Sequence, residues 1–157
     1  MYTFSTENWK RPKKEITFLI YLLERYIDQK LDYLKKKNIK LNIIGNLSKF
    51  PNTLKIKLRK AIKNTTKNNK IQINLALNYG SKQEIVSTIN KLIKKSLPIN
   101  EKNIAKNLYT KNIPDPEILI RTGNRNRLSN FLLWQSSYSE IFFIKKLWPD
   151  FTKNDFA

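Results

Sequence analysis

The longest regular spacing of apolar residues in the chain begins at Ile16 and recurs every three to four residues. This spacing predicts an amphipathic helix that packs one face against a core. Pro12 suits the first helical position and Glu15 the first turn, while Lys35–Lys37 suit the carboxyl end of the helix dipole. We therefore predict a helix from about Pro12 to about Lys37. Its apolar positions are Ile16, Leu19, Ile20, Leu23, Tyr26, Ile27, Leu31 and Leu34.

Alternation of apolar and polar residues predicts strands. Two clear examples are Ile39–Ile44 and Lys70–Leu77. A strand is also expected to end at Tyr2 and Phe4, just before a polar cluster. The apolar run Ile118–Ile120, which follows a proline-rich loop, predicts one more strand.

Further helices are expected between these strands. One is predicted at about Asn52–Thr66, after a Phe-Pro pair. Another begins at Ser81, where Glu84 completes a capping-box pattern, and runs to about Lys95. A shorter helix is expected at Asn100–Tyr109, and a last one after the final strand.

Strands and helices alternate along most of the chain. Such alternation predicts an α/β fold in which helices flank a parallel sheet and the crossovers are right-handed. No repeat or linker divides the sequence, so we expect a single domain over residues 1–157. In sheets of this kind, ligands bind beyond the carboxyl ends of the strands.

Composition narrows the chemistry available to this fold. The 157 residues include no His and no Cys, which excludes Ser-His-Asp and Cys-His nucleophiles, thiolate or imidazole zinc sites and redox thiols. Catalysis would use carboxylates, amides, hydroxyls, Lys, Arg or an oxygen-bound metal, of which Mg²⁺ is the best candidate. Without a long apolar run or a signal-peptide pattern, a cytoplasmic location is expected.

The net charge of +19, from 31 Lys and Arg against 12 Asp and Glu, has two explanations. Basic surfaces attract polyanions such as nucleic acids. The Lys residues are scattered over every segment, however, which favours compositional drift. No helix-turn-helix, RNA-binding signature or aromatic–basic platform is recognisable. We therefore expect no nucleic-acid partner and keep a basic nucleic-acid-binding domain as the remote alternative.

The richest cluster of polar chemistry follows the strand Ile118–Ile120. Arg121 enters a loop that also carries Arg127 and Ser129, and Glu140 lies in the apolar block beyond it. Arginine holds phosphate oxygens with a planar fork that stays charged near neutral pH. The loop could therefore grip a diphosphate, and Glu140 could supply one oxygen to Mg²⁺. Ion pairs are the plainer explanation for each of these charged residues.

Two more polar clusters follow predicted strands, at Ser5–Arg11 and at Asn78–Ser81. Because parallel strands end at a shared edge of the sheet, the three clusters could converge there. The tryptophans Trp9, Trp134 and Trp148 are more typical of a core than of a platform for ligands.

Several motifs, in this order, closely resemble the cis-prenyltransferase family, and its bacterial undecaprenyl diphosphate synthase branch most of all. They are FSTENWKRP, IIG, NYG, IRTG, RLSNFLLWQ, YSEIFF and LWPDF. The resemblance covers essentially the whole chain, and RLSNFLLWQ and LWPDF are highly specific to the family.

The resemblance implies a parallel-sheet homodimer that condenses isopentenyl diphosphate with an allylic diphosphate, usually farnesyl diphosphate, in the presence of Mg²⁺. The implied product is a long Z-polyprenyl diphosphate, a lipid carrier for cell-wall synthesis, through which the protein would associate peripherally with a membrane. The departing diphosphate develops negative charge that Arg and Mg²⁺ stabilise. The growing hydrocarbon needs an apolar tunnel, which the long helix and the strand faces could form.

Matching the motifs residue by residue assigns roles by resemblance. Arg121, Arg127 and Ser129 would hold isopentenyl diphosphate, and Asn8 would assist removal of the proton. Glu140 would bind Mg²⁺, reaching across the dimer interface. The full set of substrate-binding residues would be Ser5, Thr6, Glu7, Trp9, Arg11, Arg121, Arg127, Leu128 and Ser129.

The chain also departs from the family pattern. It lacks the first strand with its Mg²⁺-binding Asp and the Gly-Asn-Gly-Arg phosphate loop, so we expect it to be N-terminally truncated. Asn124, Arg125 and Asn126 replace a Gly, an acidic residue and a His. Little polyprenyl synthesis is therefore expected from residues 1–157 alone. The alternatives are a truncated reading frame, a decayed copy and a non-catalytic accessory subunit.

Overall fold

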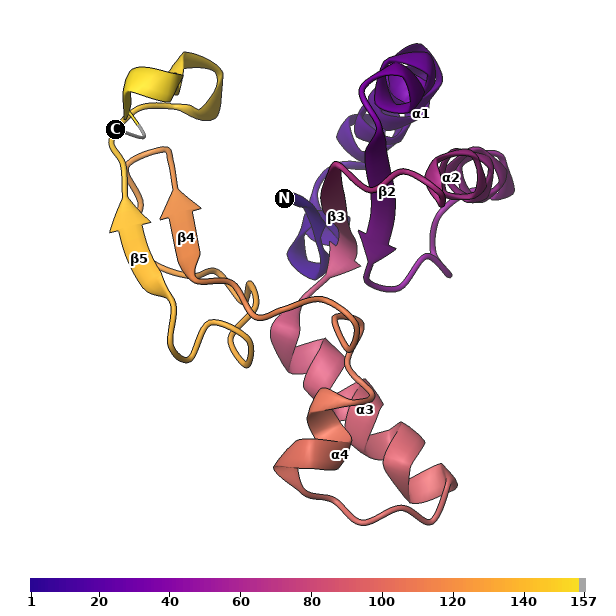
Figure 1. Cartoon of the computed structure of the whole chain (residues 1–157), viewed down its shortest axis with the longest axis vertical. Coiled ribbons are helices and arrows are strands. Elements are labelled where there is room, and N and C mark those ends of the chain that lie inside the picture. The colour runs from indigo at the N-terminus through magenta and orange to yellow at the C-terminus, as the bar shows by residue number, and fades with distance from the viewer. Residues whose placement is uncertain (156–157) are drawn as a thin grey trace. The chain divides into compact units, whose positions relative to one another are not determined.

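The structure, a computed structural model that describes residues 1–155, consists of two compact units, residues 1–80 and 81–157 (Figure 1). The first contains β1 (Tyr2–Ser5), the 3-10 helix η1 (Thr6–Lys10), α1 (Lys13–Lys36), β2 (Ile39–Ile44), α2 (Asn52–Thr65) and β3 (Ile71–Tyr79). The second contains α3 (Ser81–Lys94), α4 (Glu101–Ala105), β4 (Ile118–Arg121), β5 (Glu140–Phe143) and the 3-10 helices η2 (Trp148–Asp150) and η3 (Lys153–Asp155).

The first unit is built on a three-stranded parallel sheet with the order β1-β3-β2. β2 and β3 pair in continuous register from Ile39 opposite Ile71 to Ile44 opposite Ala76. Ser5 at the end of β1 lies opposite Tyr79 at the end of β3. The carboxyl ends of these two strands therefore meet at one edge of the sheet, as the alternating sequence pattern predicts.

α1 and α2 pack together and against β2, as Figure 1 shows, and their apolar faces join the sheet in one core. The helical spacing that starts at Ile16 is confirmed, since α1 begins and ends within one residue of the predicted bounds. Leu54 and Leu58 of α2 are completely buried. Burial of such side chains contributes about 1.5–3 kcal/mol each. The buried core residues are Phe4, Ile27, Leu41, Phe50, Leu54, Leu58, Ala61 and Leu77.

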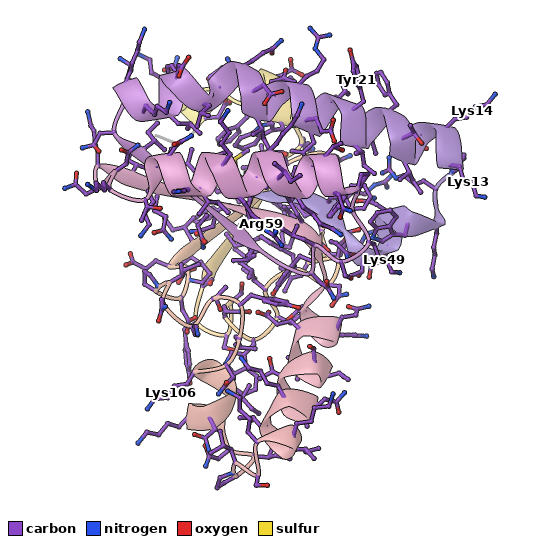
Figure 2. All side chains as sticks on the ribbon, turned by 90° about the vertical axis from the view of Figure 1, so that its right-hand side faces the viewer. Lys13, Lys14, Tyr21, Lys49, Arg59 and Lys106 are labelled. Carbon is purple, nitrogen blue, oxygen red and sulfur yellow. The ribbon has the colours of Figure 1, made fainter. Side chains whose placement is uncertain are left out.

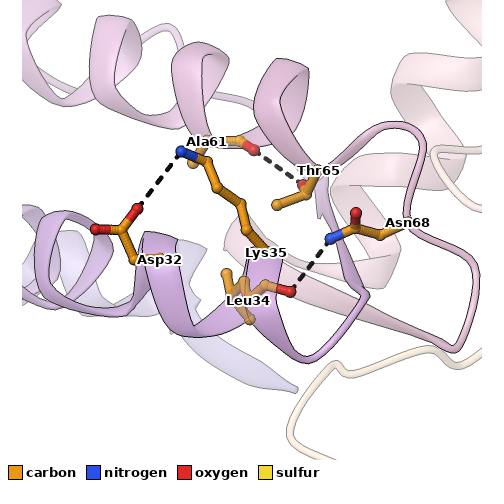
Figure 3. A network of polar contacts seen from close by, with 6 residues as sticks. All are labelled: Asp32, Leu34, Lys35, Ala61, Thr65 and Asn68. Atoms are coloured by element: carbon orange, nitrogen blue, oxygen red, sulfur yellow. Dashed lines mark hydrogen bonds and ion pairs between the residues drawn. The ribbon is translucent and has the colours of Figure 1, made fainter.

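Polar side chains satisfy backbone groups where the two helices end (Figure 3). The Nδ2 group of Asn68 donates to the Leu34 carbonyl at 3.2 Å, one of the last carbonyls of α1. The buried Thr65 hydroxyl donates to the Ala61 carbonyl at 2.9 Å and accepts from the Leu41 N–H at 3.1 Å. Terminal carbonyls of a helix have no intrahelical partner, so these bonds stabilise the helix ends against the sheet.

The second unit has a two-stranded parallel sheet in which Ile118 lies opposite Glu140 and Arg121 opposite Phe143. A smaller apolar cluster of Leu92, Ile104 and Leu108 packs with Trp134. Among residues 1–155, no helix combines the length and the apolar character needed to cross a bilayer.

The α/β class, the parallel strands and the flanking helices are confirmed. The expected last helix is wrong: β5 occupies Glu140–Phe143, because its aromatic and β-branched residues favour a strand that completes the ladder of β4. The strands of residues 1–155 form a three-stranded and a two-stranded sheet, where the sequence pattern predicts one. α4 is also shorter than the helix expected at 100–109. The expectation of a single domain over residues 1–157 stays a prediction.

Candidate functional site

Arg121 and Ser129 come together at the carboxyl end of β4. The Arg121 guanidinium donates to the Ser129 hydroxyl oxygen at 2.9 Å. The connecting loop is held in sparsely populated conformations, with φ of 54° at Asn124, 49° at Ser129 and 62° at Asn130. Left-handed residues other than glycine cluster at functional sites, because the strain persists only where the surroundings enforce it. Two of the three residues that the sequence groups as a diphosphate grip, Arg121 and Ser129, are therefore in contact.

The other loop residues assigned by resemblance are arranged differently. Arg127 is exposed and has no hydrogen-bond or ion-pair partner among residues 1–155. Leu128 is half-buried, and its carbonyl accepts from the Phe131 N–H at 3.1 Å. A solvated guanidinium two residues before Ser129 in the sequence suits capture of an incoming anion, since little protein contact has to break first.

Glu140 does not lie at the arginine end of the strand pair. It is the first residue of β5, opposite Ile118, whereas Arg121 is the last residue of β4. Three residue steps along a strand separate these levels by about 10 Å. The Glu140 side chain is exposed. The parallel register, which the sequence does not reveal, thus separates two residues that the sequence groups together.

In the first unit, the polar cluster after β1 is organised by asparagines. Asn8 in η1 accepts the Ser5 N–H through Oδ1 at 2.7 Å. Asn78, at the end of β3, accepts from the Trp9 indole at 2.7 Å and donates to the Asn46 carbonyl at 2.7 Å. These bonds join the ends of β1, β2 and β3. The expected convergence of the first two polar clusters is thus seen between Ser5–Arg11 and Asn78, inside this unit.

The remaining residues of this cluster differ in their surroundings. The Thr6 hydroxyl is buried and makes no hydrogen bond within residues 1–155. Glu7 is exposed. Arg11 forms an exposed ion pair with Glu15 at 2.5 Å. The half-buried Trp9 ring packs in the core, and its centroid lies 5.1 Å from the centroid of the Phe4 ring.

An apolar cavity of about 440 Å³ lies between α1 and the sheet of the first unit. This volume is within the range typical of small-molecule sites. Tyr26 and Lys30 are exposed at its lining, whereas Phe4 and Leu41 are buried. Its lining residues are Met1, Thr3, Phe4, Leu19, Leu22, Leu23, Tyr26, Ile27, Lys30, Leu34, Leu41, Ile73 and Leu75.

A buried carboxylate in the second unit was not predicted as part of the site. Glu84 of α3 is 1% exposed. One oxygen accepts the Tyr109 N–H at 2.7 Å, and the other accepts from the Gln135 amide at 3.1 Å. Burial, and then the charge of Glu84, raise the pKa of the Tyr109 phenol above its ordinary value of 10.0. Glu84 lies on the buried face of α3 with Thr88, and a carboxylate on such a face is the sequence signal for this network.

The positive charge is spread over many elements. Figure 2 shows Lys13 and Lys14 at the start of α1, Arg59 on α2 and Lys106 after α4 extending from their own ribbons. All four side chains are exposed. This distribution fits scattered, solvated cations better than one continuous basic stripe.

A strained polar loop with an Arg–Ser pair, and an apolar cavity under a long helix, define an α/β protein equipped for an anionic group and for a hydrocarbon. A family model described as "Putative undecaprenyl diphosphate synthase" matches residues 1–157. The chain belongs to this family, that of the cis-prenyltransferases, as the sequence motifs predict.

Curated relatives and solved structures support the same family assignment. An isoprenyl transferase from Thermotoga maritima is 40% identical over 160 residues, which cover 99% of the chain and 69% of the relative. One from Wolinella succinogenes is 44% identical, with coverages of 100% and 69%. The crystal structure of a probable undecaprenyl diphosphate synthase from Campylobacter jejuni is 42% identical, with a TM-score of 0.90, and covers 99% of the chain and 74% of the structure.

A plant structure shows the same fold at lower identity. It is lavandulyl diphosphate synthase from Lavandula x intermedia, in complex with dimethylallyl diphosphate. It is 30% identical and has a TM-score of 0.91, with coverages of 99% of this chain and 70% of that one.

Proposed function

We propose that the chain takes part in cis-prenyl transfer, in which isopentenyl diphosphate is joined to an allylic, farnesyl-type diphosphate. The observation that carries this proposal is the Arg121–Ser129 pair at 2.9 Å, in a strained loop of a chain that belongs to the family. The new carbon–carbon bond forms as the allylic diphosphate departs, and a proton then leaves the isopentenyl unit. Neither step needs a His or a Cys.

The loop of the second unit would bind the diphosphate of the isopentenyl substrate. Arg121 is half-buried and already oriented by Ser129, so its guanidinium would lose little freedom on binding. Arg127, whose side chain is exposed to solvent, would add the N–H donors of a second guanidinium. Each charge-assisted hydrogen bond contributes about 1.5–3 kcal/mol. Leu128, which is half-buried and lies between Arg127 and Ser129 in the sequence, would shield these hydrogen bonds from water.

The polar edge of the first unit carries the residues that the family resemblance assigns to proton removal and to substrate contact. Asn8 has its Oδ1 engaged by the Ser5 N–H, so we assign it an orienting role during proton removal through its remaining amide donor. Thr6, Glu7, Trp9 and Arg11 stay predicted substrate contacts. The apolar cavity beneath α1 would accept the growing hydrocarbon, because its lining is almost wholly apolar.

Mg²⁺ is the cofactor that we propose, with Glu140 as one ligand that reaches the diphosphate site across the proposed dimer interface. In the described residues no three Asp or Glu side chains lie together as a preformed metal site. Mg²⁺ commonly binds through one or two carboxylates, substrate phosphates and waters, so a single exposed carboxylate fits one position. When bound, the ion would neutralise developing negative charge on the diphosphate.

A homodimer is proposed on the exposed apolar side chains of β5. Ile141, Phe142 and Phe143 are 37%, 49% and 41% exposed. Ile141 and Phe143 share one face of β5 and Phe142 lies on the other, and exposed apolar faces mark surfaces that a partner covers. We further propose a cytoplasmic protein whose polyprenyl product is a lipid carrier for the cell wall and holds it peripherally at a membrane.

Titration of isopentenyl diphosphate by calorimetry tests the proposed function. We expect saturable binding that Arg127→Ala weakens by about 10- to 100-fold, the equivalent of one charge-assisted bond. Arg125→Ala is the matched control, because Arg125 is another exposed arginine of the same loop. Equal weakening by both variants, or salt-sensitive duplex DNA binding with no preference for diphosphate, would contradict the proposal.

The expectation of little polyprenyl synthesis from residues 1–157 alone has its own assay. Labelled isopentenyl diphosphate is incubated with farnesyl diphosphate, Mg²⁺ and the protein. Robust incorporation into a long product would show this expectation to be wrong and would leave the proposed substrates in place.

A further inference from the structure

The loop that carries Ser129 is tied to the first turn of α3 by its next residue, Asn130. The Asn130 carbonyl accepts the Ser81 N–H at 2.8 Å, and the Asn130 Oδ1 accepts the Lys82 N–H at 2.9 Å. The Asn130 amide group donates to the Gln83 side-chain oxygen at 2.9 Å. Three successive residues of α3 therefore bond to a single asparagine.

This arrangement caps a helix from a distant part of the chain. The first N–H groups of a helix have no intrahelical partner, and asparagine is among the best residues at satisfying them. Here the cap comes from 48 residues away in sequence. The contact is reciprocal, because the Ser81 hydroxyl accepts the Leu133 N–H at 3.1 Å. The α3 terminus and the segment 130–133 therefore hold each other in place.

The cap bears directly on the diphosphate site. Asn130 and Ser129 are both left-handed, with φ of 62° and 49°, and Ser129 accepts from Arg121 at 2.9 Å. Such strained backbone persists only where other bonds enforce it. The bonds from Ser81 and Lys82 act on the residue next to Ser129, and so they set where the Ser129 hydroxyl stands.

We propose that Asn130 is a positioning residue for isopentenyl diphosphate: by capping α3 it holds Ser129, and through Ser129 the Arg121 guanidinium, in the geometry that binds the diphosphate. The inference rests on the proposed function, since it takes isopentenyl diphosphate as the ligand of this loop. Asn130 itself makes no contact with the ligand in this account. Its effect passes through α3 and Ser129.

Two substitutions separate the cap from the backbone conformation. Asn130→Gly removes the side chain but allows φ of 62° without strain. Asn130→Asp keeps an acceptor for the Lys82 N–H. The matched control is Asn100→Gly, because Asn100 caps α4 of the same unit by accepting the Asn103 N–H at 2.9 Å. Calorimetric titration of isopentenyl diphosphate gives the affinity, and thermal unfolding reports folding.

We expect Asn130→Gly to weaken binding by about tenfold, as a small misplacement of a binding group does. Asn130→Asp should remain within about threefold of the wild type, because a cap is retained. Asn100→Gly should lower thermal stability and leave the affinity unchanged. If Asn130→Gly does not fold, Asn130→Asp still decides, since tenfold weakening by it would overturn the role.

The outcomes distinguish the inference from the function on which it rests. Absence of saturable binding to the wild type would overturn the proposed function, and the role of Asn130 with it. Tight binding to the wild type and equally tight binding to folded Asn130→Gly would overturn the positioning role alone.

Discussion

The two units of this chain reach order by different means. The first places an apolar core, with Leu54, Leu58 and Leu77 fully buried, between two helices and a three-stranded sheet. The second has only a small apolar cluster and buries several polar groups beside it, including Glu84 at 1% exposure and Gln135 at 3%. An apolar core tolerates an adjoining cavity for hydrocarbon, whereas directional hydrogen bonds can hold a loop in one strained conformation. The difference matches the two chemical halves of a prenyl diphosphate.

Substitution of one glycine in each unit is expected to give the largest difference in stability between the two units. A Cβ at Gly45 would stand 2.1 Å from the Leu77 carbonyl oxygen, at φ of +118°. Gly45→Ala should therefore destabilise the first unit by about 4 kcal/mol, from backbone strain and overpacking together. A Cβ at Gly123 would meet only the Leu147 side chain at 3.9 Å. Gly123→Ala should then cost only the strain, about 1–2 kcal/mol. Urea unfolding with residue-resolved hydrogen exchange measures both, and equal losses would refute the contrast.

The buried carboxylate gives the next largest effect. Glu84→Leu should destabilise the second unit by about 3 kcal/mol, because the Tyr109 N–H and the Gln135 amide lose their acceptor in a buried place. Glu84→Gln should lose less, since one oxygen still accepts the Tyr109 N–H. Urea midpoints of the two variants test this order. A leucine variant as stable as the wild type would show that packing, not hydrogen bonding, holds this unit.

The smallest expected effect is on how the stability of the second unit depends on pH in the alkaline range. Folding raises the pKa of Tyr109, first through burial and then through the charge of Glu84. A raised pKa stabilises the folded state fully below the unfolded value of about 10, and this contribution is lost as pH rises through the folded value. Tyr109→Phe should therefore flatten the decline of the urea midpoint above about pH 10. Tyr109 is only partly buried, at 39% exposure, so the control is Tyr138→Phe, at a fully exposed tyrosine of the same unit; an equal flattening there would contradict the assignment.

Much of this structure could be predicted from patterns among neighbouring residues. The helical spacing from Ile16 is a property of neighbouring residues, so it predicted α1 to within one residue at each end. Arg121 and Ser129 were predicted together because they share one loop. β5 was missed, because the residues 140–143 become a strand only through pairing with β4.

Long-range relations were harder to read. Glu140 was grouped with Arg121, yet the parallel register places them at opposite ends of the strand pair. Asn130 caps α3 from 48 residues away in the sequence. No rule of residue spacing predicts such a contact. Register and remote capping depend on tertiary packing, which a single sequence does not display.

The measurement that tests the account most directly compares three ligands on two variants. Inorganic pyrophosphate, isopentenyl diphosphate and farnesyl diphosphate are titrated by calorimetry into the wild type, Arg127→Ala and Leu23→Trp. Leu23 lines the apolar cavity, so the larger ring should fill it. Phe18→Trp, an exposed position on α1, is its control.

Arg127→Ala should weaken pyrophosphate and isopentenyl diphosphate equally. Leu23→Trp should leave both unchanged and weaken farnesyl diphosphate at least about tenfold, because the indole ring occupies space that the hydrocarbon needs, and even one methylene in an apolar pocket changes recognition about 10- to 200-fold. Loss of pyrophosphate binding in Leu23→Trp, or unchanged binding of all three ligands in Arg127→Ala, would contradict the separation of charge and hydrocarbon recognition.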